Sequence, residues 1–296
     1  MRIPRFVVLT IFVLFSVPAF TQNPAPLLVD TDWLAQHLSD RDLVLLHSGS
    51  KSRYDAEHIR GARQIMDMDV TRSSNILVYD LSPVEELRAK FAALGISDDS
   101  RIVVYSGADA VVPSTTRILF TLDYLGLGDR TSLLNGGLGA WKRAGREVTS
   151  SATAIVPGKL SARPPKNVVA DIAFVRSIGQ KAGYRLIDAR APVFFNGTEE
   201  SHGANGHIPG AINIPFSQVI DSQQMIDRAR AEELFRAAGI KPGETIVAYC
   251  HIGQQATAIL FAARTLGHRV LLYDGSFEDW SRQPDAAVEN PAKASR

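Results

Sequence analysis

The amino-acid sequence predicts an α/β fold made of two similar domains, each a parallel sheet with helices on both faces. Two observations support this prediction. Short apolar runs alternate along the chain with segments whose apolar residues recur at helical spacing, which is the pattern of strand–helix–strand units. Segments of the first half also recur in the second half, in the same order. A repeat period this long indicates duplicated domains and not a solenoid.

The internal repeat shows which segments correspond. Phe91–Tyr105 matches Phe235–Tyr249 at a constant offset of 144 residues. Further on, Leu119 corresponds to Leu260 at an offset of 141. Because the offset falls by three between these matches, we predict that the loop after Tyr105 is three residues longer than its counterpart.

The repeat and the composition together set the domain boundaries. We predict a first domain at residues 28–147 and a second domain at residues 167–290. Between them, residues 148–166 are rich in Ser, Thr, Ala, Gly and Pro without periodicity, which is typical of a surface linker.

Within the second copy the strands and helices alternate. The predicted elements are strands at 185–188, 245–249 and 269–273 and helices at 231–238 and 256–266. Parallel sheets of this kind hold their ligands at the carboxyl ends of the strands. Asp188 and Cys250 both fall at such ends.

Cys250 is the only cysteine in the chain. It follows a predicted strand directly, and a loop of five residues separates it from the helix that begins at Ala256. A thiolate here faces loop N–H groups and the positive end of a helix, which stabilise its charge and make it nucleophilic. The residues alone leave a second interpretation open, because a lone cysteine is also common as a small buried apolar residue.

The N-terminus has the pattern of a secretory signal peptide, predicted at residues 1–21. Two arginines precede an apolar run from Phe6 to Val17 that is too short for a spanning helix. Cleavage after Ala19 or Thr21 gives an exported protein, periplasmic or secreted, with no membrane partner. An uncleaved membrane anchor is the alternative.

The composition argues against one class of partner. The chain is 45% hydrophobic with a formal net charge of +1, as is ordinary for a globular protein. It contains no run of lysines or arginines, so nothing in it supports nucleic-acid binding.

Three segments that occur in both halves give the chain a resemblance to a known family. His58–Ala62 and His207–Ala211 both read His-Ile-x-Gly-Ala. The second segment is the strand before the cysteine loop, and the third is the Gly-containing stretch that ends in Trp, Asn135–Trp141 and Tyr273–Trp280. Over about residues 28–283, the chain resembles the tandem-domain rhodaneses, the sulfurtransferase family that includes thiosulfate sulfurtransferase and 3-mercaptopyruvate sulfurtransferase.

The resemblance implies two rhodanese-like domains of which only the second is catalytic. In the first copy Ser106 stands at the position of Cys250, with no general base evident beside it, so we expect that copy to be inactive. In the second, the Cys250 thiolate would take a sulfane sulfur from a donor and pass it to a thiophilic acceptor such as cyanide or a thiol. Neither a metal nor an organic cofactor is needed. Backbone N–H groups of the loop would wrap the persulfide; its residues are His251, Ile252, Gly253, Gln254 and Gln255.

The loop argues against a phosphatase. Phosphatases built on this fold have a longer loop with an arginine six residues after the cysteine, and here that position is Ala256.

Arg190 is the best candidate to bind an anionic donor, because its forked guanidinium suits oxyanions. A structural ion pair, with Glu199 as a candidate partner, is the alternative. The family usually has a second arginine four residues later, where this chain has Phe194. His251 can add positive charge only below its ordinary pKa near 6.5; a neutral ring lining the site is the other interpretation.

Two hypotheses follow. The first is an exported sulfurtransferase that uses a small anionic donor. Thiosulfate is the favoured donor and 3-mercaptopyruvate the alternative, because an exported protein does not readily meet cytosolic metabolites. The second is a non-catalytic sulfur or polysulfide carrier, which the missing arginine at Phe194 favours.

Overall fold

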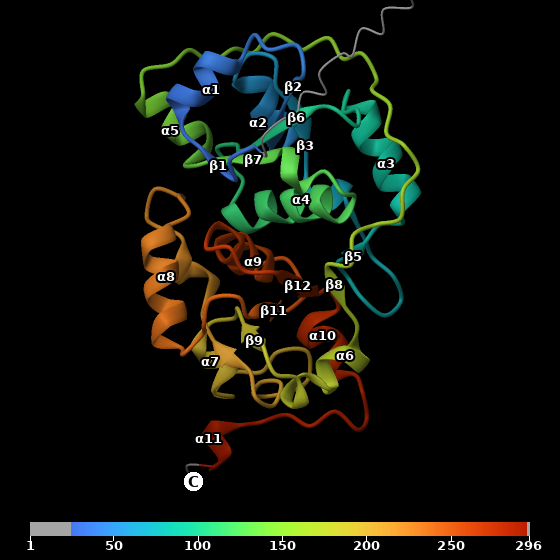
Figure 1. Cartoon of the computed structure of the whole chain (residues 1–296), viewed down its shortest axis with the longest axis vertical. Helices are drawn as coiled ribbons and strands as arrows, with labels where there is room; N and C mark the ends of the chain where they lie inside the picture. The colour runs from blue at the N-terminus through green and yellow to red at the C-terminus, as the bar shows by residue number, and fades with distance from the viewer. Residues whose placement is uncertain (1–24, 295–296) are drawn as a thin grey trace, which may run out of the picture.

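The computed structural model describes residues 25–294 and contains two α/β domains that lie one above the other along the long axis of the molecule (Figure 1). The predicted signal peptide at residues 1–21 lies outside the described residues. Within residues 25–294, no helix is both long and apolar enough to cross a membrane.

Each domain contains a five-stranded parallel sheet, and the two sheets have the same strand order. In the first domain the order is β1-β7-β6-β2-β3, and in the second it is β8-β12-β11-β9-β10. The fold class predicted from the sequence is therefore confirmed. The strands of the first sheet are β1 (Leu28–Val29), β2 (Leu43–Ser48), β3 (Arg63–Ile65), β6 (Arg101–Ser106) and β7 (Thr131–Leu134). Those of the second are β8 (Val169–Ala170), β9 (Tyr184–Asp188), β10 (Ile212–Asn213), β11 (Thr245–Tyr249) and β12 (Val270–Tyr273).

Helices cover both faces of each sheet, because successive side chains along a strand point to opposite faces. In β11, Ile246 and Ala248 pack with helices α8 and α9, whereas Val247 and Tyr249 pack with α6 and α10. The helices of the first domain are α1 (Thr31–His37), α2 (Lys51–Ala56), α3 (Val84–Ala93), α4 (Val112–Tyr124) and α5 (Gly137–Arg143). Those of the second are α6 (Ile172–Arg176), α7 (Pro192–Phe195), α8 (Arg228–Ala237), α9 (Ala256–Thr265), α10 (Ser276–Ser281) and α11 (Pro291–Ala294).

Helix α8 begins three residues earlier than the apolar periodicity predicts. The side chain of Asp227 accepts a hydrogen bond from the backbone N–H of Arg230 and so caps the helix at its N-terminus. The first turn, Arg228–Arg230, carries charged residues on its exposed side, and this is why the hydrophobic pattern does not detect it.

The prediction of a longer loop in the first copy is wrong. Five residues separate Ser106 from α4, and five separate Cys250 from α9. The three additional residues lengthen the helix instead, because α4 has 13 residues and α9 has 10.

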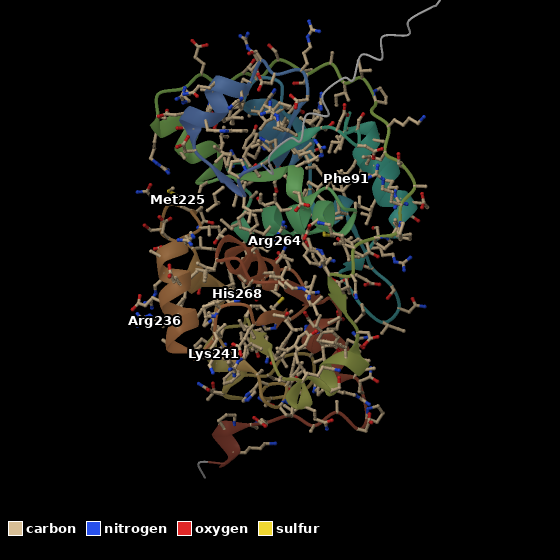
Figure 2. All side chains as sticks on the ribbon, in the orientation of Figure 1. Phe91, Met225, Arg236, Lys241, Arg264 and His268 are labelled. Carbon is tan, nitrogen blue, oxygen red and sulfur yellow. The ribbon has the colours of Figure 1, made fainter. Side chains whose placement is uncertain are left out.

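The two domains meet through α4 and α9, with Thr116 Oγ1 2.8 Å from Thr257 Oγ1. Asn135 and Asp274, which follow equivalent strands, each accept a backbone N–H from the other domain. Oδ1 of Asn135 accepts the N–H of Ile226 at 2.8 Å, and Oδ2 of Asp274 accepts that of Leu81 at 2.9 Å. Arg264, at the far end of α9, lies where the domains meet (Figure 2).

A short antiparallel hairpin of the first domain also reaches the second. It consists of β4 (Thr71–Arg72) and β5 (Asp80–Leu81). Just before β5, the N–H of Val78 donates to Oε2 of Glu278 at 3.1 Å. This hairpin and α4 therefore bring first-domain residues close to the loop that follows Cys250.

Candidate functional site

Cys250 lies at the carboxyl end of β11 and is 1% exposed. Its N–H donates to Oγ of Ser276 at 3.1 Å, and its carbonyl accepts the N–H of Phe277 at 3.1 Å. Ser276 adopts a positive φ of 53°, a backbone conformation that non-glycine residues rarely adopt. The first residues of α10 therefore hold the backbone of Cys250 in place, and Ser276 adopts a strained conformation in doing so.

Gly253 brings its backbone to the sulfur. Its N–H donates to Sγ of Cys250 at 3.2 Å, with φ at +89°. A Cβ at this position would lie 2.6 Å from the carbonyl oxygen of Asp274 and 3.0 Å from its Oδ1. Only glycine fits here without a shift of the neighbouring backbone.

The other backbone donors of the loop remain available. Among the described residues, none accepts a hydrogen bond from the N–H groups of His251, Ile252 and Gln254. Helix α9 has no side-chain cap at its N-terminus. The loop and the helix end can thus stabilise an anion bonded to the sulfur.

Arg190 is fully buried and forms a two-pronged ion pair with Asp188. Its Nε lies 3.0 Å from Oδ1 and its Nη2 2.6 Å from Oδ2 of that carboxylate. Nη2 also donates to the carbonyl of Gly206 at 2.8 Å. The partner is therefore Asp188 and not Glu199. Nη1 is buried and has no hydrogen-bond partner. Arg190 therefore forms a structural ion pair and also retains the two N–H donors of Nη1.

The ring of His251 is uncharged above about pH 4. Burial, and after it the positive charge of Arg190, lowers its pKa to about 4. Nδ1 lies 2.7 Å from Oγ of Ser201, and the ring packs edge-on against Phe194, with 4.7 Å between centroids. Phe194 thus lies beside the loop, at the position where the resemblance led us to expect a second arginine.

The side chains of the last two loop residues point toward the first domain. Nε2 of Gln254 donates to Oδ2 of Asp67 at 2.6 Å and to Oγ of Ser114 at 3.2 Å. Gln255 lines a cavity of about 380 Å³ between the domains, together with Pro113 and Phe216. The loop therefore rests on the first domain.

The sequence did not predict Asp67, Ser276 or Arg117 as residues of the site. Arg117 of α4 is fully buried and forms an ion pair with Asp274 beneath the loop. A single arginine before the apolar run Ile118–Phe120 is the signal that could have indicated a buried charge with a partner.

The corresponding site of the first copy differs in composition. His47 stands opposite Tyr105 as Asp188 stands opposite Tyr249. Oγ of Ser106 pairs with Oγ1 of Thr115 at 2.7 Å and with no base in the described part of the chain. This region therefore lacks both the thiol and the carboxylate–guanidinium pair.

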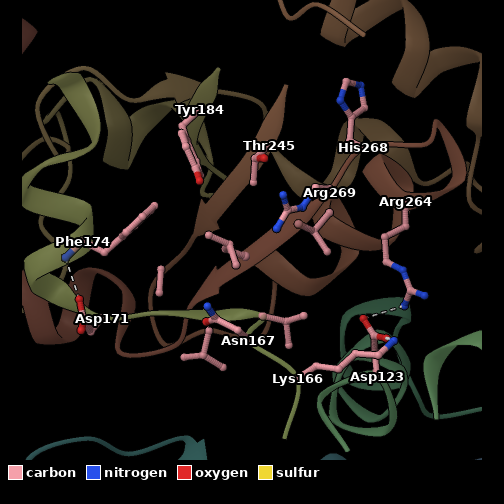
Figure 3. A pocket seen from close by; sticks show the side chains of 15 residues that line it. Asp123, Lys166, Asn167, Asp171, Phe174, Tyr184, Thr245, Arg264, His268 and Arg269 are labelled. Atoms are coloured by element: carbon pink, nitrogen blue, oxygen red, sulfur yellow. Dashed lines mark hydrogen bonds and ion pairs between the residues drawn. The ribbon is translucent and has the colours of Figure 1, made fainter. Parts of the chain in front are cut away.

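A cavity of about 600 Å³ lies at the opposite edge of the second sheet (Figure 3). Tyr184, Thr245 and Val270, the first residues of three strands, line it. Lys166 and Arg264 both pair there with Asp123 (Figure 3). Because this edge is opposite to Cys250, the cavity is separate from the thiol site. Residues 25–294 contain no group of three or more His, Cys, Asp or Glu side chains that could hold a metal ion.

Comparison with known proteins identifies the family. The model of the rhodanese-like domain matches residues 30–144 and again residues 174–283. The probable 3-mercaptopyruvate sulfurtransferase of Pseudomonas aeruginosa is 31% identical over 278 residues, 88% of this chain and 97% of that protein. The thiosulfate sulfurtransferase of the same organism is 30% identical over 267 residues, 89% of this chain and 97% of that protein.

The 3-mercaptopyruvate sulfurtransferase of Escherichia coli strain K12 is 26% identical, over 88% of this chain and 97% of that protein. Among solved structures, YnjE superposes with a TM-score of 0.79 at 23% identity, over 89% of this chain and 68% of that chain. A variant of EanB in complex with ergothioneine gives 0.80 at 21% identity, over 90% of this chain and 70% of that chain. Both share the fold. The chain therefore belongs to the rhodanese-like family, with two copies of the domain, and its curated relatives are sulfurtransferases.

Proposed function

We propose that this protein transfers a sulfane sulfur from a small anionic donor to a thiophilic acceptor through a persulfide on Cys250. The observation that carries the proposal is the position of the thiol. Cys250 stands at the carboxyl end of β11, the N–H of Gly253 donates to its Sγ at 3.2 Å, and further loop N–H groups are unused. These donors would stabilise both the thiolate and the terminal sulfur of a persulfide anion.

The reaction has two steps. The Cys250 thiolate attacks the outer sulfur of the donor, so that an S–S bond forms to Sγ and the bond between that sulfur and the rest of the donor breaks. With thiosulfate, sulfite leaves with the bonding electron pair. An acceptor such as cyanide then attacks the outer sulfur, forms thiocyanate and returns the thiolate. This is covalent catalysis in two half-reactions.

We propose thiosulfate as the donor, as expected for an exported protein. Arg190 supports binding of an anion, because its Nη1 is buried and has no partner.

The second candidate donor is 3-mercaptopyruvate. It is favoured by the weak positive charge around the loop. His251 is neutral above about pH 4, and Phe194 stands in place of a second arginine. A donor with one carboxylate needs less compensating positive charge in the site than the thiosulfate dianion does.

The experiment supplies each donor with cyanide and measures thiocyanate. Cys250→Ser should abolish turnover with both donors. Ser106→Ala, the same position in the first domain, is the matched control and should leave turnover unchanged. Activity that survives in Cys250→Ser would refute the mechanism. If neither donor turns over but polysulfide adds one sulfur to Cys250 by mass spectrometry, the protein is a carrier.

We also propose that the protein is exported, on the strength of the N-terminal sequence. Expression of the full chain in a secreting bacterial host should give a mature form that starts after Ala19 or Thr21, measured by intact mass. A membrane-bound form with an intact N-terminus would favour the anchor.

A further inference from the structure

A buried guanidinium of the first domain lies directly beneath the loop of the second. Arg117 is 0% exposed. Almost all of the remaining residues of its helix α4 are buried as well, including Ile118 and Leu119. A charge in such a place is costly unless it is paired and hydrogen-bonded.

The contacts of Arg117 converge on the residue that binds the sulfur. Nη1 forms an ion pair with Oδ1 of Asp274 and lies 3.4 Å from the carbonyl oxygen of Gly253. Nη2 donates to the carbonyl of Tyr79 at 3.3 Å, and Nε has no partner. A Cβ on Gly253 would lie 3.3 Å from Nη1. Arg117 therefore touches the one loop residue whose N–H reaches Sγ of Cys250.

Arg117 also keeps its charge in this place. Burial acts to lower the pKa of Arg117, but the negative charge of the Asp274 carboxylate and the hydrogen bond to it raise that pKa above its ordinary value. Asp274 is held in turn by the N–H of Leu81 at 2.9 Å. Two groups of the first domain thus fix the carboxylate against which Gly253 packs.

We propose that Arg117 is a positioning residue for sulfur transfer, supplied by the first domain, which lacks the cysteine. It holds Gly253 and Asp274 so that the Gly253 N–H stays on the sulfur, and it places a fixed positive charge beneath the thiolate and the persulfide. This inference rests on the proposed function and adds a role for the first domain to it.

A second interdomain ion pair provides a matched control. Nη1 of Arg264 lies 3.2 Å from Oδ2 of Asp123, which is 5% exposed, so this pair also joins the two domains. It lies near the carboxyl end of α9, about 12 Å along the helix from the loop. Arg264→Met removes an interdomain pair without touching the thiol site.

The experiment compares Arg117→Met, Arg117→Lys and Arg264→Met in the full chain. Iodoacetamide alkylation of Cys250 is followed by mass spectrometry from pH 6 to 9, and turnover is measured with the active donor. Arg117→Met should slow alkylation at pH 7 about tenfold, the equivalent of one pH unit, and move the alkylation curve to higher pH. It should lower kcat more than it changes KM. Arg117→Lys keeps the positive charge, so its alkylation rate should depend on pH as in the wild type. Arg264→Met should also match the wild type in alkylation and in kcat.

The inference is overturned if Arg117→Met and Arg264→Met give the same alkylation curve and the same kcat. Thermal unfolding reports whether each variant folds. If Arg117→Met does not fold, the double variant Arg117→Met/Asp274→Asn is measured in its place, because it removes both buried charges of the pair. Failure of the proposed function looks different, because the wild type itself would then form no persulfide from any donor, while the alkylation comparison would remain interpretable.

Discussion

Replacement of Gly253 by alanine tests the geometry of the loop. The φ of +89° costs an L-residue about 1–2 kcal/mol. The new Cβ would also lie 2.6 Å from the backbone oxygen of Asp274, which cannot rotate away. Relief of such overpacking costs about 1–3 kcal/mol more. Gly253→Ala should therefore lower the free energy of unfolding by about 2–5 kcal/mol in total.

Gly267 provides the matched control. Its φ is +86°, and an added Cβ would meet nothing within 4 Å. Gly267→Ala should therefore show only the backbone cost, about 1–2 kcal/mol by urea unfolding. The clash at Gly253 can be relieved only by a shift of the loop, which takes its N–H away from Sγ. Loss of one such donor should slow persulfide formation about a hundredfold in Gly253→Ala and not in Gly267→Ala. Equal losses of stability and rate in both variants would refute this reasoning.

Three further predictions concern the charges around the site. Asp188→Ala leaves the buried Arg190 guanidinium without its partner and should cost about 3–5 kcal/mol in urea unfolding; a loss below about 1 kcal/mol would mean that the pair is not needed. Burial, and then the carboxylate of Asp274, raises the pKa of Asp80 to about 6, so wild-type stability should fall as the pH rises through 6. In Asp80→Asn, the decrease in the free energy of unfolding between pH 5 and 8 should be smaller than in the wild type by about 1 kcal/mol, a figure reduced because Asp80 is partly exposed to solvent. If urea unfolding shows the same pH dependence in both proteins, the prediction is wrong. Because the pKa of His251 is lowered to about 4 by burial, the pH profile of kcat/KM from 5 to 8 should have no inflection that His251→Gln removes.

The sequence was sufficient to predict the architecture because each domain is encoded by local patterns. Strand β11 and helix α9 occupy the predicted residues to within one position, since apolar runs and helical periodicity mark them directly. The duplication predicted two similar domains, and the two sheets have the same strand order. The position of the three-residue insertion was predicted wrongly, because the matched residues fix the offset only from Leu119 onward, well inside α4.

The candidate site was predictable only in part. Cys250 follows from its place after a strand. The ion-pair partner of Arg190 could not be identified from the sequence, because Asp188 and Glu199 are both close enough to Arg190 in the chain to reach it. The contacts of Asp67 and Arg117 with the loop depend on how the two domains pack against each other. No local sequence pattern encodes that packing.

The contact between α4 and α9 has the symmetry of a homodimer. Thr116 and Thr257 differ by the same offset of 141 that relates Leu119 to Leu260, so equivalent residues face each other across it. The interface is approximately isologous, as between two similar but not identical subunits. The connection between the domains then acts as a tether, which makes association intramolecular at an effective concentration in the millimolar range. First-domain residues contact the loop and the second domain carries the thiol, so the site is assembled only when the two halves are docked.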